Sequence, residues 1–171
     1  MNAMDRVIAR DEIQQLAFRY ALATDARDID GLVGLFVEDV RVGADGRGRD
    51  ALRRSFEEQL RAVGVTILFV GNHLIDFEED DLAQGHVYCR AEVQDGDRWV
   101  QQAILYRDRY RRCDGKWYFV RRLHKLWYGM EAPKNPLAQP LAHWPENHAG
   151  RGSLPEEWDS WRKFWGDGER G

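Results

Sequence analysis

Apolar side chains in the first part of the chain recur with the period of an α-helix. Ile13, Leu16, Ala17, Tyr20 and Thr24 follow the i, i+3, i+4, i+7 spacing and so form one stripe. This pattern predicts an amphipathic helix that turns the stripe toward the protein core.

Two further helical patterns follow before the middle of the chain. We expect a short helix within residues 28–36, with Asp28 or Asp30 as its N-cap. Its buried side consists of Leu32, Leu35 and Phe36. After a short strand at residues 39–43 and a glycine-rich turn, a third helix is expected over residues 49–63. Its apolar face consists of Leu52, Phe56, Leu60 and Val63.

The second half changes to the alternating pattern of β-strands. Four long runs of this kind occupy residues 66–77, 82–94, 98–112 and 117–128. Asp-Gly pairs connect the last three runs, and this dipeptide is a strong hairpin signal. Three helices followed by four antiparallel strands predict an α+β fold in which a bent sheet wraps around the helices. Such sheets bend at bulges or glycines, and Gly71 and Gly85 are the candidates.

The composition shifts near residue 133, where Pro, Gly, His and Asn become frequent. We therefore expect residues 1–132 to form one domain and residues 133–171 to form a C-terminal extension with one short helix. Ser153 is the expected N-cap of that helix, and Pro155 lies in its first turn, where proline is tolerated.

Three tryptophans give this last helix an apolar face. Trp158, Trp161 and Trp165 recur at i, i+3 and i+7 and need to be buried. The extension then docks on its own domain, closes over a pocket as a lid, or contacts a neighbouring subunit, since aromatic residues are enriched at interfaces.

The charge balance narrows the classes of partner. A net charge of -4 and a pI near 5.8 argue against nucleic acid as the main partner. Basic residues cluster at 107–112 and 120–125, but their alternation with apolar residues favours solvent-facing strand positions over an anion site. No run approaches the ~18 apolar residues that span a membrane.

The cysteines and the N-terminus indicate a cytoplasmic setting. Cys89 and Cys113 lie outside any Cys-x-x-Cys motif, which is typical of a reducing compartment. The first residues lack the apolar segment of a signal peptide. None of the histidines has the spacing of a metal-ligand pair, so no metal site is expected.

Asp25 and Tyr20 are the first residues that suggest chemistry. At ~100° per residue, Asp25 lies about 140° from Tyr20 on a helical wheel. Periodicity alone therefore favours a solvated carboxylate at the helix end. Tyr20 lies on the core stripe, where a phenol usually finds a hydrogen-bond partner.

The alternation of side chains along the last two predicted strands suggests a second group of candidate site residues. In the last strand, one face carries Arg122, His124 and Leu126. If this face meets Tyr106 and Asp108 of the third strand, Asp108 pairs with Arg122, and Tyr106 and His124 point into one cavity. A single histidine on a strand is more often structural than catalytic, and both interpretations stay open here. Serine-hydrolase, P-loop and dinucleotide-binding motifs are absent.

Residues 5–128 resemble the SnoaL-like branch of the NTF2-like superfamily. The similarity is carried by residues 10–40, 71–88 and 105–122, and most specifically by Tyr-x-Asp-x-Tyr followed by Asp-Gly-x-Trp. The resemblance implies a cone-shaped α+β barrel, in which a curved, mixed or antiparallel sheet wraps three N-terminal helices and opens into a ligand pocket. It also implies chemistry without a cofactor. The superfamily includes polyketide cyclases, ketosteroid isomerases, dehydratases and a dehydrochlorinase, together with members that only bind.

The same resemblance assigns site residues. Asp25 stands at the catalytic aspartate of the dehydratase and dehydrochlorinase branch, and Tyr20 matches a tyrosine of the bile-acid dehydratases. The family histidine falls on Leu68. His73 has the opposite strand parity and should face away unless a bulge at Gly71 changes the phase.

The resulting hypothesis is a pocket enzyme of the lyase or isomerase type that acts on a hydrophobic cyclic molecule. Asp25 would be the base, Tyr20 would orient the substrate oxygen, and His124 would replace the missing histidine. The expected lining residues are Leu68, Asn72, Tyr106, Arg122 and Leu126. Two alternatives remain open: a binding or assembly module without turnover, and an accessory subunit like the small subunit of ring-hydroxylating dioxygenases.

Self-association is also expected, because apolar residues of the outer sheet face need cover. Trp127 and Phe119 are assigned to that face by strand parity. The family forms dimers and trimers, and the tryptophan-bearing extension favours a trimer with exchanged tails.

Overall fold

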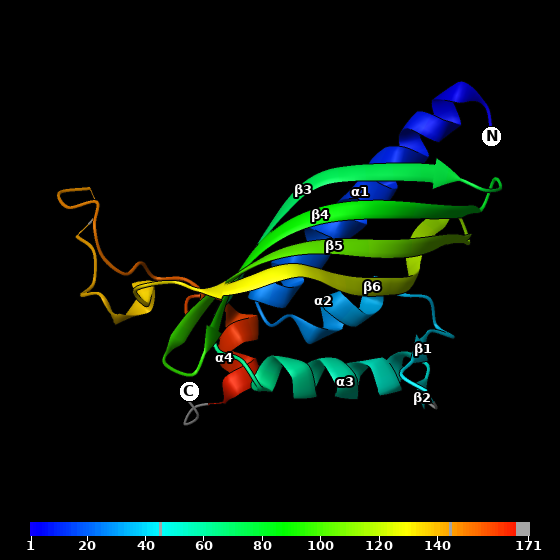
Figure 1. Ribbon diagram of the computed structural model, residues 1–171. Helices are drawn as coiled ribbons and strands as arrows, with labels where there is room; N and C mark the ends of the chain where they lie inside the picture. The colour runs from blue at the N-terminus through cyan, green and yellow to red at the C-terminus, as the bar shows by residue number, and fades with distance from the viewer. Residues whose placement is uncertain (45, 144, 167–171) are drawn as a thin grey trace.

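A computed structural model describes residues 1–44, 46–143 and 145–166. Its helices are α1 (Ala3–Asp25), α2 (Ile29–Gly34), α3 (Arg49–Arg61), η1 (Pro136–Ala138) and α4 (Asp159–Trp165). Its strands are β1 (Arg41–Val42), β2 (Gly46–Arg47), β3 (Thr66–Phe77), β4 (Leu82–Asp95), β5 (Arg98–Cys113) and β6 (Lys116–Glu131). In Figure 1 the long strands form a bent sheet over α1 and α2, and α3 lies beneath them. None of the described helices is long and apolar enough to cross a membrane.

The predicted α+β architecture is confirmed. The sheet has the order β3-β4-β5-β6, and every neighbouring pair is antiparallel. At the β5–β6 turn, Asp114 and Gly115 both have positive φ, of 48° and 81°, which matches the right-handed twist of a hairpin. Only part of β6 gains a further partner: the Phe119 N–H donates to the Leu35 carbonyl at 2.9 Å, and the Val37 N–H donates to the Phe119 carbonyl at 3.0 Å.

The apolar stripe of α1 faces the concave side of the sheet as predicted. Ile13 and Ala17 are fully buried, and Leu16 and Thr24 nearly so. A capping box between Asn2 and Asp5 satisfies free N–H groups at the start of this helix. The stripe continues into the core through residues of α2 and the sheet, which include Leu32, Phe36, Tyr110, Trp117 and Phe119.

The sheet has three register shifts, one of them between Ala103 and Ile104, and the other two decide which side chains of the site point inward. The β3–β4 register shifts between Val70 and His73, at the site predicted around Gly71. The extra residue reverses the alternation, so His73 lies on the inner face. The β5–β6 register shifts again between Arg109 and Tyr110.

That second bulge corrects one sequence-based assignment. Phe119 was assigned to the outer face with Trp127, and this is wrong: Phe119 is 0% exposed, whereas Trp127 is 61% exposed. Because Phe119 pairs with Tyr110 and Arg121 pairs with Arg109, Val120 is the extra residue on β6. It places Phe119 and Arg122 on the same inner side despite their odd spacing.

The C-terminal helix is shorter than predicted, and Ser153 is not its N-cap. Trp158 holds that position, while the Ser153 hydroxyl donates to Glu157. The Trp158 N–H donates to the Pro155 carbonyl and closes a separate turn, so regular helical bonding starts only at Asp159. The domain boundary near residue 132 and any tail exchange stay predictions.

Within this chain, α4 packs against the end of α1. The Ser160 hydroxyl donates to the Ala26 carbonyl at 2.7 Å, and the guanidinium of Arg27 lies 4.9 Å from the Trp161 ring centroid. Trp161 also joins Val65 and Trp99 in a small apolar cluster. The tryptophans of the extension are therefore covered at least in part by their own domain.

Candidate functional site

Asp25 is the last residue of α1, and both of its carboxylate oxygens are held. The Thr66 hydroxyl donates to Oδ1 at 2.9 Å, and the Leu68 N–H donates to Oδ2 at 3.0 Å. Leu68 is free to do so because β3 is an edge strand of the sheet. Burial raises the pKa of Asp25 to about 6, against the lowering effects of these two hydrogen bonds and of Arg27. Asp25 is thus not the solvated helix-end charge that periodicity favoured.

Arg27 fixes the direction of the Thr66 hydroxyl. Its guanidinium is buried and donates to the Thr24 carbonyl at 2.6 Å, to the Thr66 Oγ1 at 2.9 Å and to the Gly64 carbonyl. Since Thr66 Oγ1 accepts from Arg27, its own proton is directed to Asp25. Burial lowers the pKa of Arg27 to about 10, so the guanidinium stays charged at neutral pH.

Tyr20 stands inside an aromatic box. Its ring centroid lies 6.0–6.4 Å from four neighbours, in edge-to-face geometry: Phe36, Phe56, Tyr106 and Phe119. The phenol makes no hydrogen bond to any described residue, although Tyr20 keeps some accessible surface. Burial raises the pKa of Tyr20, so the group is a neutral donor with a free hydroxyl.

The predicted pair of Arg122 and Asp108 is confirmed and is deeply buried. Arg122 binds the carboxylate through Nε at 3.0 Å and Nη2 at 2.7 Å, and the two side chains are 4% and 0% exposed. The guanidinium lies 4.4 Å from the Tyr20 ring, 4.3 Å from Tyr106 and 4.5 Å from Phe119. These stacking contacts and the bidentate hydrogen bonds compensate in part for the loss of water around both charges.

A hydrogen-bonded chain extends from this pair to His73. The Tyr110 hydroxyl donates its one proton to Asp108 at 2.9 Å, so the His73 Nε2, 3.0 Å from the same oxygen, must be the protonated ring nitrogen. Burial lowers the pKa of His73 to about 4, and the ring is neutral. Gly85 leaves room for the contact, because a Cβ there would lie 3.0 Å from the Tyr110 ring.

The sequence did not predict that the hydrogen-bonded series Asp108, Tyr110 and His73 belongs to the site. Tyr110 and Asp108 were visible in the Tyr-x-Asp-x-Tyr motif, but His73 was expected to face outward unless a bulge at Gly71 changed the phase of the strand. The one signal in its favour was Gly71, the glycine expected to bend the strand.

Cys89 lies between the two polar groups. Burial raises the pKa of its thiol to about 11, and Arg122 lowers this pKa while Asp25 raises it. Both charges are therefore within electrostatic reach of one inner position on β4. Leu68, whose N–H binds Asp25, packs in one apolar cluster with Cys89 and Tyr106. The Tyr106 ring lies 4.3 Å from the Arg122 guanidinium. Asp25 and the Arg122–Asp108 pair therefore lie at the same apolar interior.

His124 is near Tyr106 but does not contact Asp25. Its ring centroid is 5.6 Å from that of Tyr106, and burial lowers its pKa. Asp25 binds to β3, whereas His124 is on β6, three strand spacings or about 14 Å away along the sheet. The structure does not join these two residues as a hydrogen-bonded dyad.

The other predicted lining residues are divided between the two faces. Tyr106 is buried on the inner face and, like Tyr20, makes no hydrogen bond through its hydroxyl to a described residue. Leu126 pairs with the buried Ile104 but is itself 52% exposed. Asn72 is exposed in the β3 bulge and lines an outer groove with Phe69, so its place is outside the interior that holds Asp25.

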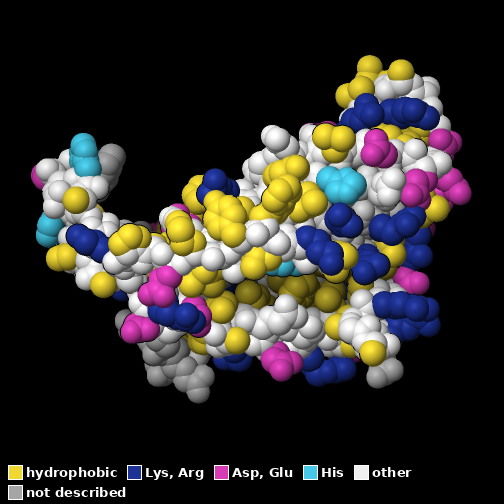
Figure 2. Space-filling view, viewed as in Figure 1, with side chains coloured by type: hydrophobic (Ala, Val, Ile, Leu, Met, Phe, Trp, Pro, Cys, Tyr) yellow, Lys and Arg dark blue, Asp and Glu magenta, His cyan; other side chains and the backbone are white. Residues whose placement is uncertain are grey.

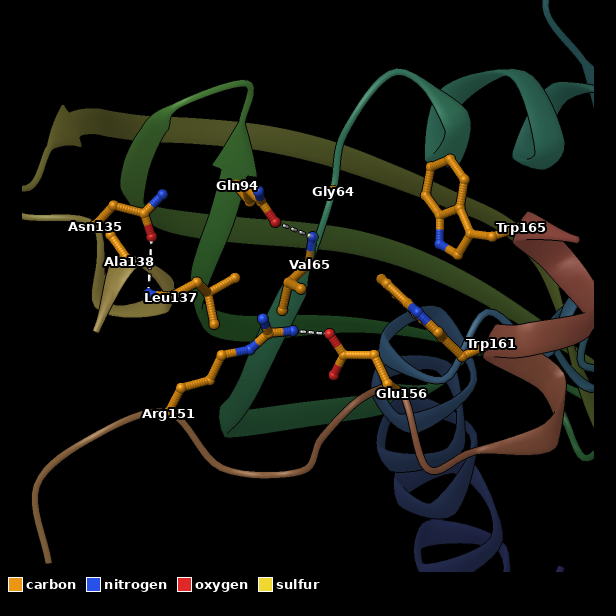
Figure 3. Close-up of a pocket in the computed structure, with 10 residues that line it drawn as sticks. All are labelled: Gly64, Val65, Gln94, Asn135, Leu137, Ala138, Arg151, Glu156, Trp161 and Trp165. Atoms are coloured by element: carbon orange, nitrogen blue, oxygen red, sulfur yellow. Dashed lines mark hydrogen bonds and ion pairs between the residues drawn. The ribbon is translucent and has the colours of Figure 1, made fainter. Parts of the chain in front are cut away.

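A cavity of about 280 Å³ is lined by Gly64 and Trp161, both of which contact Arg27 (Figure 3). Trp161 and Trp165 project from α4 on one side, and Arg151 and Glu156 form an ion pair on the other. Figure 3 also shows the Gln94 side chain bonded to the Val65 N–H, at 3.1 Å. The lining contains none of the predicted site residues.

The described residues hold no group of three or more His, Cys, Asp or Glu side chains placed to bind a metal ion. In Figure 2 the surface is hollowed between the β6 edge and α3, and hydrophobic side chains form the floor of the hollow. The contact between Tyr20 and Phe56 connects α1 to α3.

Comparison with known proteins agrees with this architecture. A family model described as SnoaL-like domain matches residues 5–123. No curated protein matches the chain significantly.

Several solved structures share the fold at low identity. A proposed scytalone dehydratase from Novosphingobium aromaticivorans is 22% identical, with a TM-score of 0.67 over 82% of this chain and 100% of that one. The hexachlorocyclohexane dehydrochlorinase LinA-type3 from Novosphingobium barchaimii is 20% identical, with a TM-score of 0.69 over 77% and 95%. A proposed aromatic ring hydroxylase from Novosphingobium aromaticivorans is 23% identical, with a TM-score of 0.65 over 74% and 94%. The fold and the family match agree, and this chain belongs to the SnoaL-like family of the NTF2-like superfamily.

Proposed function

We propose that this protein is a lyase or isomerase that removes a proton from a hydrophobic cyclic molecule without a cofactor. The observation that carries the proposal is the state of Asp25. Its carboxylate is oriented by Thr66 and Leu68 and desolvated enough to raise its pKa to about 6. A base with this pKa is ionised at neutral pH and is stronger than an ordinary aspartate.

In the proposed reaction, Asp25 takes a proton from a carbon next to a carbonyl group. The C–H electron pair becomes the new double bond, and negative charge develops on the carbonyl oxygen. Tyr20 is placed to stabilise that oxygen, because its neutral hydroxyl is free to donate a hydrogen bond. The intermediate is reprotonated in an isomerisation, or it expels a leaving group in an elimination.

Two similar structures support the elimination branch through their names, a dehydratase and a dehydrochlorinase. Loss of water or of hydrogen chloride removes a proton together with a leaving group. His124 would supply the proton to the leaving group from β6, at the opposite edge of the sheet from Asp25, because it lies beside Tyr106.

A binding module without turnover is the second candidate, and one observation favours it. The family histidine position holds Leu68, whose main chain binds Asp25, and the inner histidine, His73, is engaged with Tyr110. Under this alternative, a ligand binds beside the free hydroxyl of Tyr20 and no reaction follows. Co-purification with a large iron–sulfur subunit would instead identify an accessory subunit, and the similar hydroxylase structure makes that experiment worthwhile.

Solvent exchange tests the proposed chemistry without knowledge of the natural substrate. Cyclic ketones incubated with the protein in deuterated buffer are expected to gain deuterium next to the carbonyl, as followed by NMR. Asp25 must be ionised to act, so the exchange rate should rise with pH and level off above an apparent pKa of about 6. No exchange above the buffer background would argue for binding alone, and a rate that is independent of pH between about 5 and 8 would exclude Asp25 as the base.

Thr66→Val is expected to move this pH profile to higher pH. The lost hydroxyl donates to Asp25, and that hydrogen bond lowers the pKa of the carboxyl group. The measurement is the midpoint of the exchange rate against pH. Thr66→Ser keeps the hydroxyl and serves as the matched control, with a midpoint near that of the wild type. Equal midpoints for Val and Ser would show that Asp25 does not control the rate.

A further inference from the structure

Six arginines line one cavity at the edge of β6. The cavity has a volume of about 600 Å³ and lies between β6, the end of β5 and the β1–β2 hairpin. Its arginines are Arg41, Arg47, Arg109, Arg111, Arg121 and Arg122. Figure 2 shows Lys and Arg side chains gathered on this part of the surface.

Four of these arginines are paired with one another across strands. Arg41 lies opposite Arg47 in the β1–β2 hairpin, and Arg109 lies opposite Arg121 in the β5–β6 ladder. Like charges directly opposite each other destabilise an antiparallel pair. Both pairs are exposed to solvent, and an anion bound between them would offset their repulsion.

The acidic residues nearby neutralise only half of this charge. Ion pairs engage Arg109 with Glu78 at 2.6 Å, Arg111 with Asp39 at 2.6 Å and Arg122 with Asp108 at 2.7 Å. The other three cavity arginines form no hydrogen bond or ion pair with a described residue: Arg41, Arg47 and Arg121.

Apart from Asp39, whose charge acts on both Arg111 and Arg47, and Gly43, the remaining walls are apolar. They include Val37, Val40, Val120 and Leu123, which lie between the charged groups. Such a combination suits a molecule with a charged end and a hydrophobic body, because the arginines bind an oxyanion while the body packs on the valines.

We propose that this cavity binds a small organic oxyanion, a carboxylate or a phosphate ester, through Arg41, Arg47 and Arg121. The alternating sequence pattern favoured solvent-facing strand positions for these basic clusters, and Arg109 and Arg121 are indeed exposed. The fold adds what alternation could not show: the β1–β2 hairpin brings two arginines from far away in the chain, and Val120 and Arg121 of the β6 bulge line the same cavity. This inference is independent of any role of Asp25.

Calorimetry with phenyl phosphate and benzoate tests the proposal, with benzyl alcohol as the neutral probe. Wild-type protein is expected to bind at least one of the two anions, and the tighter one identifies the class of oxyanion. Binding should weaken at higher salt, as expected for exposed charges. In the double variant Arg47→Gln/Arg121→Gln the dissociation constant should increase about tenfold or more, because charge-assisted hydrogen bonds are lost.

The control is a double variant with the same change in charge, Arg54→Gln/Arg107→Gln. Both residues are exposed but lie outside the cavity lining. Its affinity should equal that of the wild type. The proposal is overturned if neither anion binds, if benzyl alcohol binds equally well, or if the control loses as much affinity as the cavity variant. Deuterium exchange by Asp25 is measured in a separate experiment. A negative result for anion binding therefore does not bear on the proposed proton abstraction.

Discussion

The Asp25→Asn variant is expected to lose about 10²–10⁴-fold in the rate of deuterium exchange, the usual effect of removing a general base. The amide keeps the shape of the side chain, although it can accept only one of the two hydrogen bonds from Thr66 and Leu68. A ligand bound beside Tyr20 should therefore bind with little change. The measurement pairs the exchange rate from NMR with the ligand dissociation constant from calorimetry. A large loss of rate at constant affinity assigns Asp25 to the chemical step.

The stability expected for the Asp25→Asn variant separates a loss of catalysis from a loss of the folded structure. The folded-state pKa of Asp25, about 6, lies above its ordinary value of 3.8, so ionisation of Asp25 costs stability as the pH rises between these values. The Asn variant avoids that cost at neutral pH and should stay folded. Asp11→Asn, an exposed position on the same helix, is the matched control and should keep full activity. Full exchange activity in the Asp25 variant would exclude Asp25 as the base.

Asp108→Ala is expected to destabilise the protein by about 3–5 kcal/mol, because it leaves the buried Arg122 without a counter-charge. Tyr110 loses its acceptor at the same time. For a domain of this size, such a loss lowers Tm by roughly 6–20 °C, which thermal unfolding followed by circular dichroism measures.

Two control variants test whether the loss of stability in Asp108→Ala comes from leaving a buried charge unpaired. Glu78→Ala breaks the exposed ion pair with Arg109 and should cost no more than about 1 kcal/mol. The double variant Asp108→Leu/Arg122→Met removes both buried charges and should be more stable than Asp108→Ala alone. If Glu78→Ala proved as harmful as Asp108→Ala, burial of the Arg122 pair would not be the cause.

The local pattern of the chain was sufficient to predict the elements. Ile13 and Leu16 follow a helical stripe that the core of the protein uses, and the Asp-Gly pair at Gly115 forms the hairpin it indicates. The pairing of Arg122 with Asp108 was also predictable, because both lie on neighbouring strands at matching positions.

The regular alternation of side chains along a strand could not predict the effect of one extra residue at a β-bulge. The bulge after Val70 turns His73 inward, and the bulge at Val120 puts Phe119 and Arg122 on one face. A regular alternation assigns at least one residue of each such pair to the wrong side. The position of Asp25 on the helical wheel predicted a solvated carboxylate. This was wrong, because the Leu68 N–H on the edge strand β3, far away in the sequence, binds the carboxylate.

Self-association stays a prediction, and the outer face of the sheet is a candidate surface for it. The outer face of the sheet exposes large apolar residues over several strands: Ile67, Phe69, Leu74, Tyr88, Trp127 and Tyr128. Patches of this kind on a folded domain usually have a partner. A dimer or trimer through this face, or through the C-terminal extension, would be seen by sedimentation.

The pKa of Asp25 itself tests the account most directly. Carboxyl carbons of ¹³C-labelled aspartate can be titrated by NMR, and the signal of Asp25 is assigned by its loss in the Asp25→Asn variant. The account predicts a midpoint at about 6, raised by burial at the end of α1. A midpoint near the ordinary value of 3.8 would show a solvated carboxylate and would contradict the proposed base.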